Sequence, residues 1–248
     1  MTTSIAGRVA VVTGASRGLG RAIVAALVAD GAQVALLARP SRSLDETATS
    51  FGDAVLACPC DIRSAAAVHG AIEQAVRRFS RLDILVNNAA ACLVNKIESV
   101  PDEDVRTEIE TNFMAPIWCS RAVIPHMKAA GGGDIVNISS ESVNAVVPYM
   151  TNYAATKAAL ETFSFGLRDE LRPYGVRVTV LRSGAMETSI VDQWSEAQKQ
   201  AFFSAFQDSP RQAQTGRSID PAITARALLN ILKLPAEASM RLVELGGK

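Results

Sequence analysis

Apolar residues along this chain gather in short runs, and the segments between the runs repeat apolar side chains at helical spacing. The runs are rich in β-branched residues and predict strands at 8–13, 33–38, 54–60, 82–89, 134–139 and 177–182. The intervening segments predict helices at 19–30, 43–50, 64–79, 102–129 and 152–172, and Pro116 can kink the longest of them. Strands and helices therefore alternate along most of the sequence.

This alternation predicts a parallel sheet with helices on both faces, because each crossover must return over the sheet before the next parallel strand begins. We expect a doubly wound α/β fold in a single domain spanning residues 1–248, since the pattern contains no linker-like, repetitive or low-complexity segment. In such folds, ligands bind beyond the carboxyl ends of the strands. Site residues should therefore follow the strands directly.

Composition argues against several classes of partner. A chain of 248 residues, 48% of them hydrophobic, can bury a full core. Basic and acidic residues balance at 25 each, so no global field would hold a nucleic acid or an anionic membrane surface. The sequence shows no secretory leader pattern and no run of about 18 apolar residues. We therefore expect a cytoplasmic protein that binds neither nucleic acid nor membranes.

The cysteines are scattered among apolar neighbours, unlike a disulfide framework in a small secreted domain. They are Cys58, Cys60, Cys92 and Cys119. No histidine stands near Cys58 and Cys60 at the spacing of metal ligands. We interpret all of these thiols as reduced core side chains and expect no metal site.

A glycine-rich segment, TGASRGLG at 13–20, connects the first strand to the first helix. Its glycines permit a tight turn and let a pyrophosphate approach the helix N-terminus, where free N–H groups and the helix dipole favour anions. An ordinary tight turn could look the same, but the position after the first strand of a doubly wound sheet favours dinucleotide binding. The expected contacts are Gly14, Ser16, Arg17, Gly18, Leu19 and Gly20.

A serine, a tyrosine and a lysine form a second motif. Ser140 closes the fifth strand, Tyr153 lies 13 residues later, and Lys157 follows four residues after it. Positions i and i+4 share a helix face, so the phenol and the ammonium group can reach one pocket. Tyrosine, with an ordinary pKa near about 10, is a poor base at neutral pH, but a nearby ammonium and an oxidised nicotinamide would lower that pKa.

Together these motifs resemble the classical short-chain dehydrogenases/reductases, and the match covers most of the chain. The resemblance implies a Rossmann-type fold and an oxidoreductase, such as a ketoreductase, that moves a hydride between a nicotinamide and the carbonyl or alcohol carbon of a small substrate. It assigns Tyr153 as general acid/base and Ser140, rather than Ser139, as the hydrogen-bond partner of the substrate oxygen. Lys157 would bind the nicotinamide ribose and tune Tyr153.

Asn112 matches the fourth member of the family's catalytic set. Asparagine is a mediocre helix former, and a locally distorted helix that holds a water for proton relay would explain its place inside the predicted helix at 102–129. The alternative is an ordinary asparagine on the face of that helix.

Further segments at strand ends resemble cofactor contacts of the family. Asp61 follows the third strand and resembles an adenine-contacting aspartate, while NNAA at 87–90 resembles the NNAG motif with Ala90 in place of glycine. RSGAMET at 182–188 resembles a PGxxxT segment with serine in place of proline. The alternatives are a helix N-cap for Asp61, structural hydrogen bonding for Asn87, and an ordinary loop at 182–188. The cofactor contacts implied here are Asp61, Ile62, Asn88, Ala89, Gly184 and Thr188.

The end of the second strand bears on which nicotinamide is used. Ala38 stands where NAD-preferring relatives carry an acidic residue for the ribose diol. Arg39 next to it, and Arg17 in the glycine-rich segment, offer planar donors that suit a 2′-phosphate. We therefore expect NADP (NADPH) as the cofactor, the alternative being that both arginines are solvated surface residues.

Aromatic residues gather at 188–217, where family members place a variable substrate lid. They are Trp194, Phe202, Phe203 and Phe206. We interpret them as an apolar substrate pocket under a lid, against the alternative of a helix buried on the core. Further candidates for the pocket wall are Asn144, Val146, Tyr149 and Met150.

The resemblance also implies a homodimer or homotetramer in which the helices at 102–129 and 152–172 pair with symmetry mates. Two other functions stay open. One is redox-neutral catalysis with a bound nicotinamide, such as elimination or epimerisation. The other is a dinucleotide sensor without catalysis, which would typically lack the tyrosine or the lysine. Both residues are present here.

Overall fold

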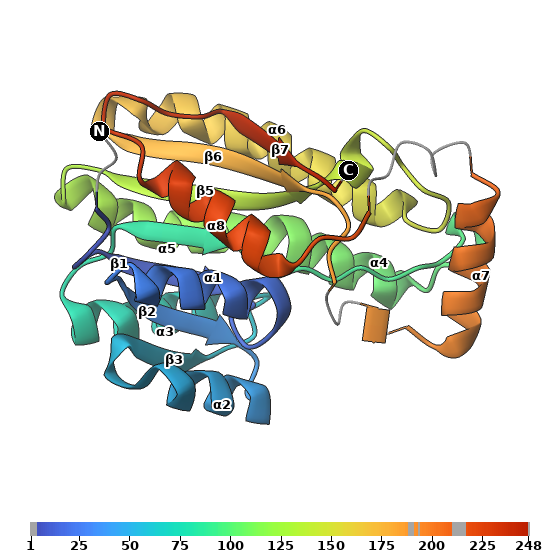
Figure 1. The fold of residues 1–248 in the computed structure, drawn as a ribbon, viewed down its shortest axis with the longest axis horizontal. Coiled ribbons are helices and arrows are strands. Elements are labelled where there is room, and N and C mark those ends of the chain that lie inside the picture. Colours follow the sequence, from blue (N-terminus) through green and yellow to red (C-terminus); the bar gives the residue numbers. More distant parts are fainter. Residues whose placement is uncertain (1–3, 188–190, 193, 210–216, 248) are drawn as a thin grey trace.

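A parallel sheet forms the centre of the molecule (Figure 1). The structure is a computed structural model that describes residues 4–187, 191–192, 194–209 and 217–247. Within these residues, seven strands pair in parallel in the order β3-β2-β1-β4-β5-β6-β7. Their bounds are Val9–Thr13 (β1), Gln33–Ala38 (β2), Val55–Pro59 (β3), Ile84–Asn87 (β4), Gly133–Ser140 (β5), Val176–Ser183 (β6) and Leu242–Leu245 (β7).

Helices cover both faces of this sheet. One face carries Gly18–Ala29 (α1), Arg42–Phe51 (α2) and Pro221–Leu232 (α8), and the other carries Ala65–Phe79 (α3), Ala115–Ala129 (α5) and Thr151–Leu171 (α6). Two further helices, Asp102–Ile109 (α4) and Glu196–Gln207 (α7), lie on the side to which the strand arrows point in Figure 1. The doubly wound, Rossmann-type fold expected from the sequence is confirmed.

The strand sequences are almost continuously apolar because both faces of the sheet are buried. In β1, Ala10 and Val12 belong to the core under α1 and α8, whereas Val9 and Val11 belong to the core under α3 and α5. All of these side chains are fully buried. A strand with one solvated face would have alternated polar and apolar residues instead.

The helix predicted at 102–129 is interrupted, which corrects the sequence-based expectation. α4 ends at Ile109, a π-helical turn spans Glu110–Met114, and α5 begins at Ala115. Pro116 falls in the first turn of α5, directly after the π-helical turn. The local distortion expected around Asn112 is present as the π-helical turn.

Two C-terminal elements were not predicted. α8 begins with a signal that the sequence contains: the side chain of Asp220 accepts a hydrogen bond from the N–H of Ala222, and Pro221 occupies the first turn. β7 adds a strand beside β6, so Val180 lies opposite Leu242. Its four residues are too few to show a period, and their pairing is non-local.

All four cysteines are free and buried. Burial raises the pKa of the Cys58 and Cys60 thiols to about 11, which keeps them protonated at neutral pH. Among the described residues, no helix has the length and apolar character that crossing a bilayer requires.

Candidate active site

A cleft of about 1330 Å³ lies beyond the carboxyl ends of the strands. It gathers nearly all of the residues that the sequence analysis selected. Its wall includes Gly14, Ser16, Arg17, Gly18, Leu19, Gly20, Arg39, Asp61, Ile62, Asn88, Ala89, Ser140, Tyr153, Lys157 and Gly184. Asn112 is fully buried and does not line the cleft. Thr188 lies outside the described residues, as do other parts of the predicted lid at 188–190, 193 and 210–216.

The glycine-rich segment packs so closely that Gly14 and Gly20 leave no space for a side chain. Gly14 has a φ of 65°, and a Cβ there would lie 2.9 Å from the Cα of Ala89. A Cβ at Gly20 would collide with the carbonyl oxygen of Gly14. α1 begins at Gly18 without a side-chain cap, so its first N–H groups remain open to a ligand. This cradle fits a pyrophosphate group.

Thr13 and Asn88 brace that cradle. The hydroxyl of Thr13 accepts hydrogen bonds from the N–H groups of Asn88 and Ala89, each at 3.0 Å, and Nδ2 of Asn88 donates to the carbonyl oxygen of Thr13 at 2.9 Å. Asn87 points elsewhere: its Nδ2 donates to Oδ1 of Asn137 at 2.8 Å inside the sheet. The structural alternative for Asn87 therefore stands.

Tyr153 and Lys157 project from α6 and are 8% and 2% exposed. Nζ of Lys157 donates a 2.9 Å hydrogen bond to the carbonyl oxygen of Ile138 in β5. Burial lowers the pKa of Lys157 to about 8. Burying an ammonium group with so few hydrogen-bond partners costs desolvation free energy. Buried charges of this kind are typical of functional sites.

The pKa of Tyr153 is raised, chiefly by burial, while the lowering expected from the sequence depends also on an oxidised nicotinamide and stays a prediction. Cys92 and Glu108 add to the increase, and a hydrogen bond with Ser140 opposes it. Desolvation of the phenolate outweighs the ammonium group, which lies 5.8 Å from the centre of the tyrosine ring. Tyr153 therefore keeps its proton at neutral pH.

The two adjacent serines of β5 take different roles because successive side chains of a strand point to opposite sides. The hydroxyl of Ser139 donates to Oε1 of Glu161 at 2.6 Å and is buried. The hydroxyl of Ser140 accepts from the N–H of Ser142 at 3.2 Å and interacts with Tyr153. Of the two, Ser140 is thus the one placed beside the phenol.

Asn112 fastens the loop after β4 to α6. Its Oδ1 accepts from the N–H of Ala91 at 2.8 Å, and its Nδ2 donates to the carbonyl oxygen of Ala91 at 2.8 Å and to Oγ1 of Thr156 at 3.0 Å. The alternative of an asparagine on an ordinary helix face is therefore wrong. The π-helical turn lets a side chain of this helix point inward with all of its polar atoms paired.

Glu108 was not singled out from the sequence, yet it braces the same loop. It is 1% exposed and accepts hydrogen bonds from the N–H of Leu93 at 2.8 Å and from Nδ2 of Asn152 at 2.6 Å. Burial raises its pKa. The available signal was a carboxylate one helical turn before Asn112.

Asp61 reaches the cleft from the loop after β3, and its carboxylate pairs with Arg63. The N-cap of α3 is Ser64, which accepts from the N–H of Ala67, so the N-cap alternative for Asp61 is wrong. Arg63 also lines the cleft and was not predicted.

The loop after β6 is held from two sides. The N–H of Gly184 donates to the carbonyl oxygen of Leu245 at 2.8 Å, and the N–H of Ala185 donates to Oε1 of Glu141 at 3.1 Å. A Cβ at Gly184 would lie 2.9 Å from Oε2 of Glu141. These contacts order the loop although Ser183 stands where the resemblance expects proline. Glu141 was not predicted, and its pKa is raised by burial.

The aromatic residues of the predicted lid line the cleft, together with Leu93, Val147 and Met150. Trp194 is 6% exposed, and its Nε1 donates to the carbonyl oxygen of Cys92 at 2.6 Å. α7 has no buried residue, so the alternative of a helix buried on the core is wrong.

Three of the four residues proposed for the pocket wall between Ser140 and Tyr153 do not line the cleft. Asn144 and Val146 are exposed and are not part of the cleft wall. Tyr149 packs against the apolar cluster of Cys92, Val94, Tyr153 and Trp194 instead. Only Met150 lies in the wall.

Comparison with known proteins shows the same likeness in a family model and in a relative of similar length. A family model described as short chain dehydrogenase matches residues 8–199. An uncharacterized oxidoreductase of Staphylococcus aureus is 31% identical over 239 residues, covering 96% of this chain and 96% of that protein.

Two solved structures extend the likeness over nearly the whole chain. A serine dehydrogenase in its closed form with NADP+ superposes with a TM-score of 0.85 at 27% identity, covering 96% of this chain and 94% of its own. A 3-ketoacyl-(acyl-carrier-protein) reductase from Brucella melitensis, complexed with NADH, superposes with a TM-score of 0.86 at 28% identity, covering 98% of each chain.

Proposed function

Because this chain belongs to the short-chain dehydrogenases, a family of oxidoreductases, we propose that it is an NADP-dependent ketoreductase acting on small, partly apolar substrates. The observation that carries the proposal is the meeting of Ser140, Tyr153 and Lys157 in one cleft with the glycine cradle. Neither a structural role nor a binding role alone requires a buried phenol beside a buried ammonium.

The proposed chemistry divides between cofactor and protein. A bound nicotinamide supplies or accepts the hydride. Ser140 and Tyr153 donate hydrogen bonds to the substrate oxygen, and Tyr153 passes its proton to that oxygen as a carbonyl becomes an alcohol. Its raised pKa ensures that the proton is present at neutral pH. In the reverse direction the phenolate takes the proton back.

Lys157 and the surrounding apolar residues support that transfer. The ammonium group stabilises the phenolate that remains after proton donation, while the carbonyl oxygen of Ile138 holds the ammonium in place. Trp194 and Cys92 pack around Tyr153 and exclude water. Fewer water molecules then compete for hydrogen bonds with the reacting atoms. Asn112 bonds to Ala91 and to Thr156, and so holds the loop after β4 in a fixed position relative to α6.

The preference for NADP rests on this chain's own residues, since its structural neighbours carry either NADP+ or NADH. Ala38 and Arg39 lie in the cleft wall at the end of β2, and Arg17 at the start of α1 lines the same cleft. A 2′-phosphate would find two guanidinium groups and no carboxylate at position 38. Asp61, a carboxylate of the same wall, is already paired with Arg63.

The preference for partly apolar substrates rests on the wall near Trp194. That wall consists of Leu93, Val147, Met150, Val191, Trp194, Phe202, Phe203 and Phe206. Apolar surface of this kind favours ligands that lose little hydration on entry, and it penalises a second charge. We propose that the residues of 188–217 that the structure describes, which include α7, act as the substrate lid over this pocket.

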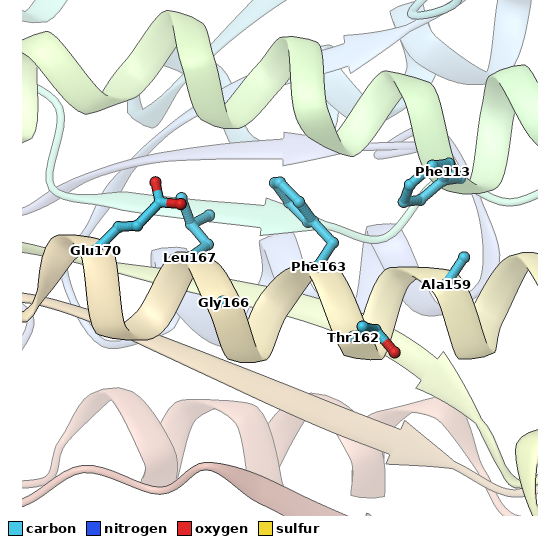
Figure 2. A pocket seen from close by; sticks show the side chains of 7 residues that line it. All are labelled: Phe113, Ala159, Thr162, Phe163, Gly166, Leu167 and Glu170. Carbon is cyan, nitrogen blue, oxygen red and sulfur yellow. The ribbon is translucent and has the colours of Figure 1, made fainter.

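An apolar groove on the outer side of α6 supports a homo-oligomer (Figure 2). It is lined by Phe113, Ala159, Thr162, Phe163, Gly166, Leu167 and Glu170. Figure 2 shows Phe163 and Leu167 pointing from α6 toward α5, and the rings of Phe113 and Phe163 meet edge to face at 6.5 Å. We propose a second copy of this chain as the occupant, as the predicted pairing of these helices requires.

One experiment tests the proposed function and its alternatives. A panel of aldehydes and ketones is assayed with NADPH and with NADH, while the absorbance of the reduced nicotinamide is recorded and products are analysed. A ketoreductase consumes reduced nicotinamide in step with alcohol formation. Product without a change in absorbance identifies redox-neutral catalysis, and nucleotide binding without any product across the panel identifies a sensor.

A further inference from the structure

The carboxylate of Asp61 is held entirely by Arg63. Nε of Arg63 donates to Oδ1 and to Oδ2 at 3.1 Å each, and its NH2 group donates to Oδ2 at 2.8 Å. The backbone N–H of Arg63 donates to Oδ1 at 3.0 Å as well. This forked arrangement occupies both oxygens and fixes the direction of the carboxylate.

Arg39 and Asp61 follow neighbouring strand ends: Ala38 of β2 lies opposite Pro59 of β3, and the N–H of Cys60 donates to the carbonyl oxygen of Ala38 at 2.8 Å. The pKa of Asp61 is lowered first by the hydrogen bond from Arg63, and Arg39 contributes to the decrease. Among the described residues, the guanidinium groups of Arg39 and Arg17 have no hydrogen-bond or ion-pair partner, and both line the cleft. Asp61 thus has a second cation nearby with which it could pair.

The Asp61–Arg63 pair has little value for folding. The two side chains are 39% and 34% exposed, and exposed pairs contribute only about 0–1 kcal/mol to stability. Asp61 does not cap α3 either, since Ser64 does so. Because the pair contributes little to folding, its main effect is on the cleft, whose wall contains both side chains.

We propose that Arg63 determines nucleotide specificity by keeping Asp61 from pairing with Arg39. With Asp61 engaged, Arg39 stays free for a 2′-phosphate. Without Arg63, the carboxylate turns to Arg39 and competes with the phosphate for the same donors, while a nucleotide with a free 2′-hydroxyl is much less affected. The inference rests on the proposed NADP preference and assigns Arg63 as a positioning residue that acts through Asp61.

A double-mutant cycle tests this role on the full-length protein without catalysis. The variants are Arg63→Gln, Asp61→Asn and the double variant. The ligands are adenosine 2′,5′-bisphosphate and adenosine 5′-monophosphate, which differ only in the 2′-phosphate, and their Kd values are measured by calorimetry. The readout is the Kd of adenosine 5′-monophosphate divided by the Kd of adenosine 2′,5′-bisphosphate. A loss of adenine contact that weakens both ligands equally cancels in this ratio. Arg77→Gln, at the exposed far end of α3 and about 20 Å along that helix, controls for the loss of one positive charge.

In the wild-type protein we expect this ratio of Kd values to exceed about 10, which means tighter binding of the ligand that carries the 2′-phosphate. Arg63→Gln should lower the ratio about three- to fivefold, whereas Asp61→Asn and Arg77→Gln should leave it within about twofold of wild type. The double variant should regain the wild-type ratio to within about twofold, because the competing carboxylate is gone. Melting temperatures should change little, as expected for an exposed pair.

Each other result overturns the inference in a recognisable way. An unchanged ratio in Arg63→Gln shows that Asp61 does not compete for Arg39. A double variant as weak as Arg63→Gln shows that Arg63 binds the 2′-phosphate itself. Equal weakening of both ligands shows a merely structural role. A wild-type ratio near one overturns the NADP preference as well, which distinguishes failure of the proposed function from failure of this inference alone.

Discussion

Nζ of Lys157 lies 5.8 Å from the centre of the Tyr153 ring, one turn along the same buried face of α6. The ammonium donates its hydrogen bond to a β5 carbonyl and not to the phenol. Its influence on Tyr153 therefore acts through space, in surroundings that oppose charge on either group. Such an arrangement favours a protonated phenol in the resting protein and a stabilised phenolate once the proton has moved.

Tyr153→Phe removes the proton carrier and leaves the ring in its apolar surroundings. We expect the rate of carbonyl reduction to fall at least about 100-fold, because positioned acid/base catalysis typically supplies 10²–10⁴-fold. Melting temperature and NADPH affinity, measured by fluorescence, should stay near wild type. Tyr174→Phe is the matched control, since Tyr174 is 47% exposed and remote from the cleft. More than about a tenth of the wild-type rate in Tyr153→Phe would refute the assignment.

Lys157 makes stability depend on pH in a predictable direction. Its folded pKa, about 8, lies below the ordinary value of 10.5, so between these pH values the unfolded chain binds more protons and stability rises with pH. The difference in unfolding free energy between wild type and Lys157→Met should therefore shift in favour of wild type by about 2 kcal/mol from pH 7.5 to 9.5.

Chemical denaturation at a series of pH values checks this prediction. The buried thiols of Cys58 and Cys60, whose raised pKa works in the opposite direction, are present in both proteins and cancel in the difference. Lys96→Met, at an exposed position, should show no such trend. A pH-independent difference between wild type and Lys157→Met would mean that the ammonium is not desolvated.

Trp194→Ala should raise KM for apolar carbonyl substrates more than it lowers kcat. The indole closes one side of the pocket and ties it to the loop after β4 through the carbonyl oxygen of Cys92. Trp194→Phe keeps an aromatic ring and loses only that hydrogen bond, so its KM should lie between those of wild type and Trp194→Ala. Steady-state kinetics on a homologous series of ketones tests this, and a dicarboxylate as the best substrate would contradict the apolar pocket.

Replacing Ala38 by Asp and Arg39 by Leu should invert the nucleotide preference. The new carboxylate repels a 2′-phosphate and offers a partner for the free ribose diol, while the loss of Arg39 removes a donor. Each arginine should favour NADPH over NADH by roughly 10- to 100-fold in the unmodified protein. The ratio of kcat/KM for the two nucleotides is the measurement, and equal values in the unmodified protein would count against both arginines.

Gly166→Arg should dissociate the proposed homo-oligomer without unfolding the protomer. A Cβ at Gly166 meets nothing within 4 Å, so the larger side chain clashes only with an occupant of the groove. Gly70→Arg on α3 is the matched control, because a Cβ there also meets nothing within 4 Å. Light scattering should show a smaller mass for Gly166→Arg alone. An unchanged mass would place the contact elsewhere or indicate a monomer.

Much of the fold follows from local features of the sequence. Apolar runs such as 33–38 mark strands that are buried on both faces, and the match with β2 extends to both of its ends. The glycine cradle could also be predicted, from the segment TGASRGLG at 13–20. The positive φ of Gly14 and the crowding at Gly20 explain why these two positions hold glycine. The spacing of Ser140, Tyr153 and Lys157 selected the residues that share the cleft.

Tertiary structure decided the properties that depend on distant neighbours. Burial raises the pKa of Tyr153, and the engagement of Asp61 by Arg63 becomes visible only in three dimensions. Glu108 stands one helical turn before Asn112 in the sequence, but its contacts with Leu93 and Asn152 appear only in the folded structure. Sequence periodicity reports which face of an element is buried, whereas desolvation and pairing depend on what other segments bring to that face.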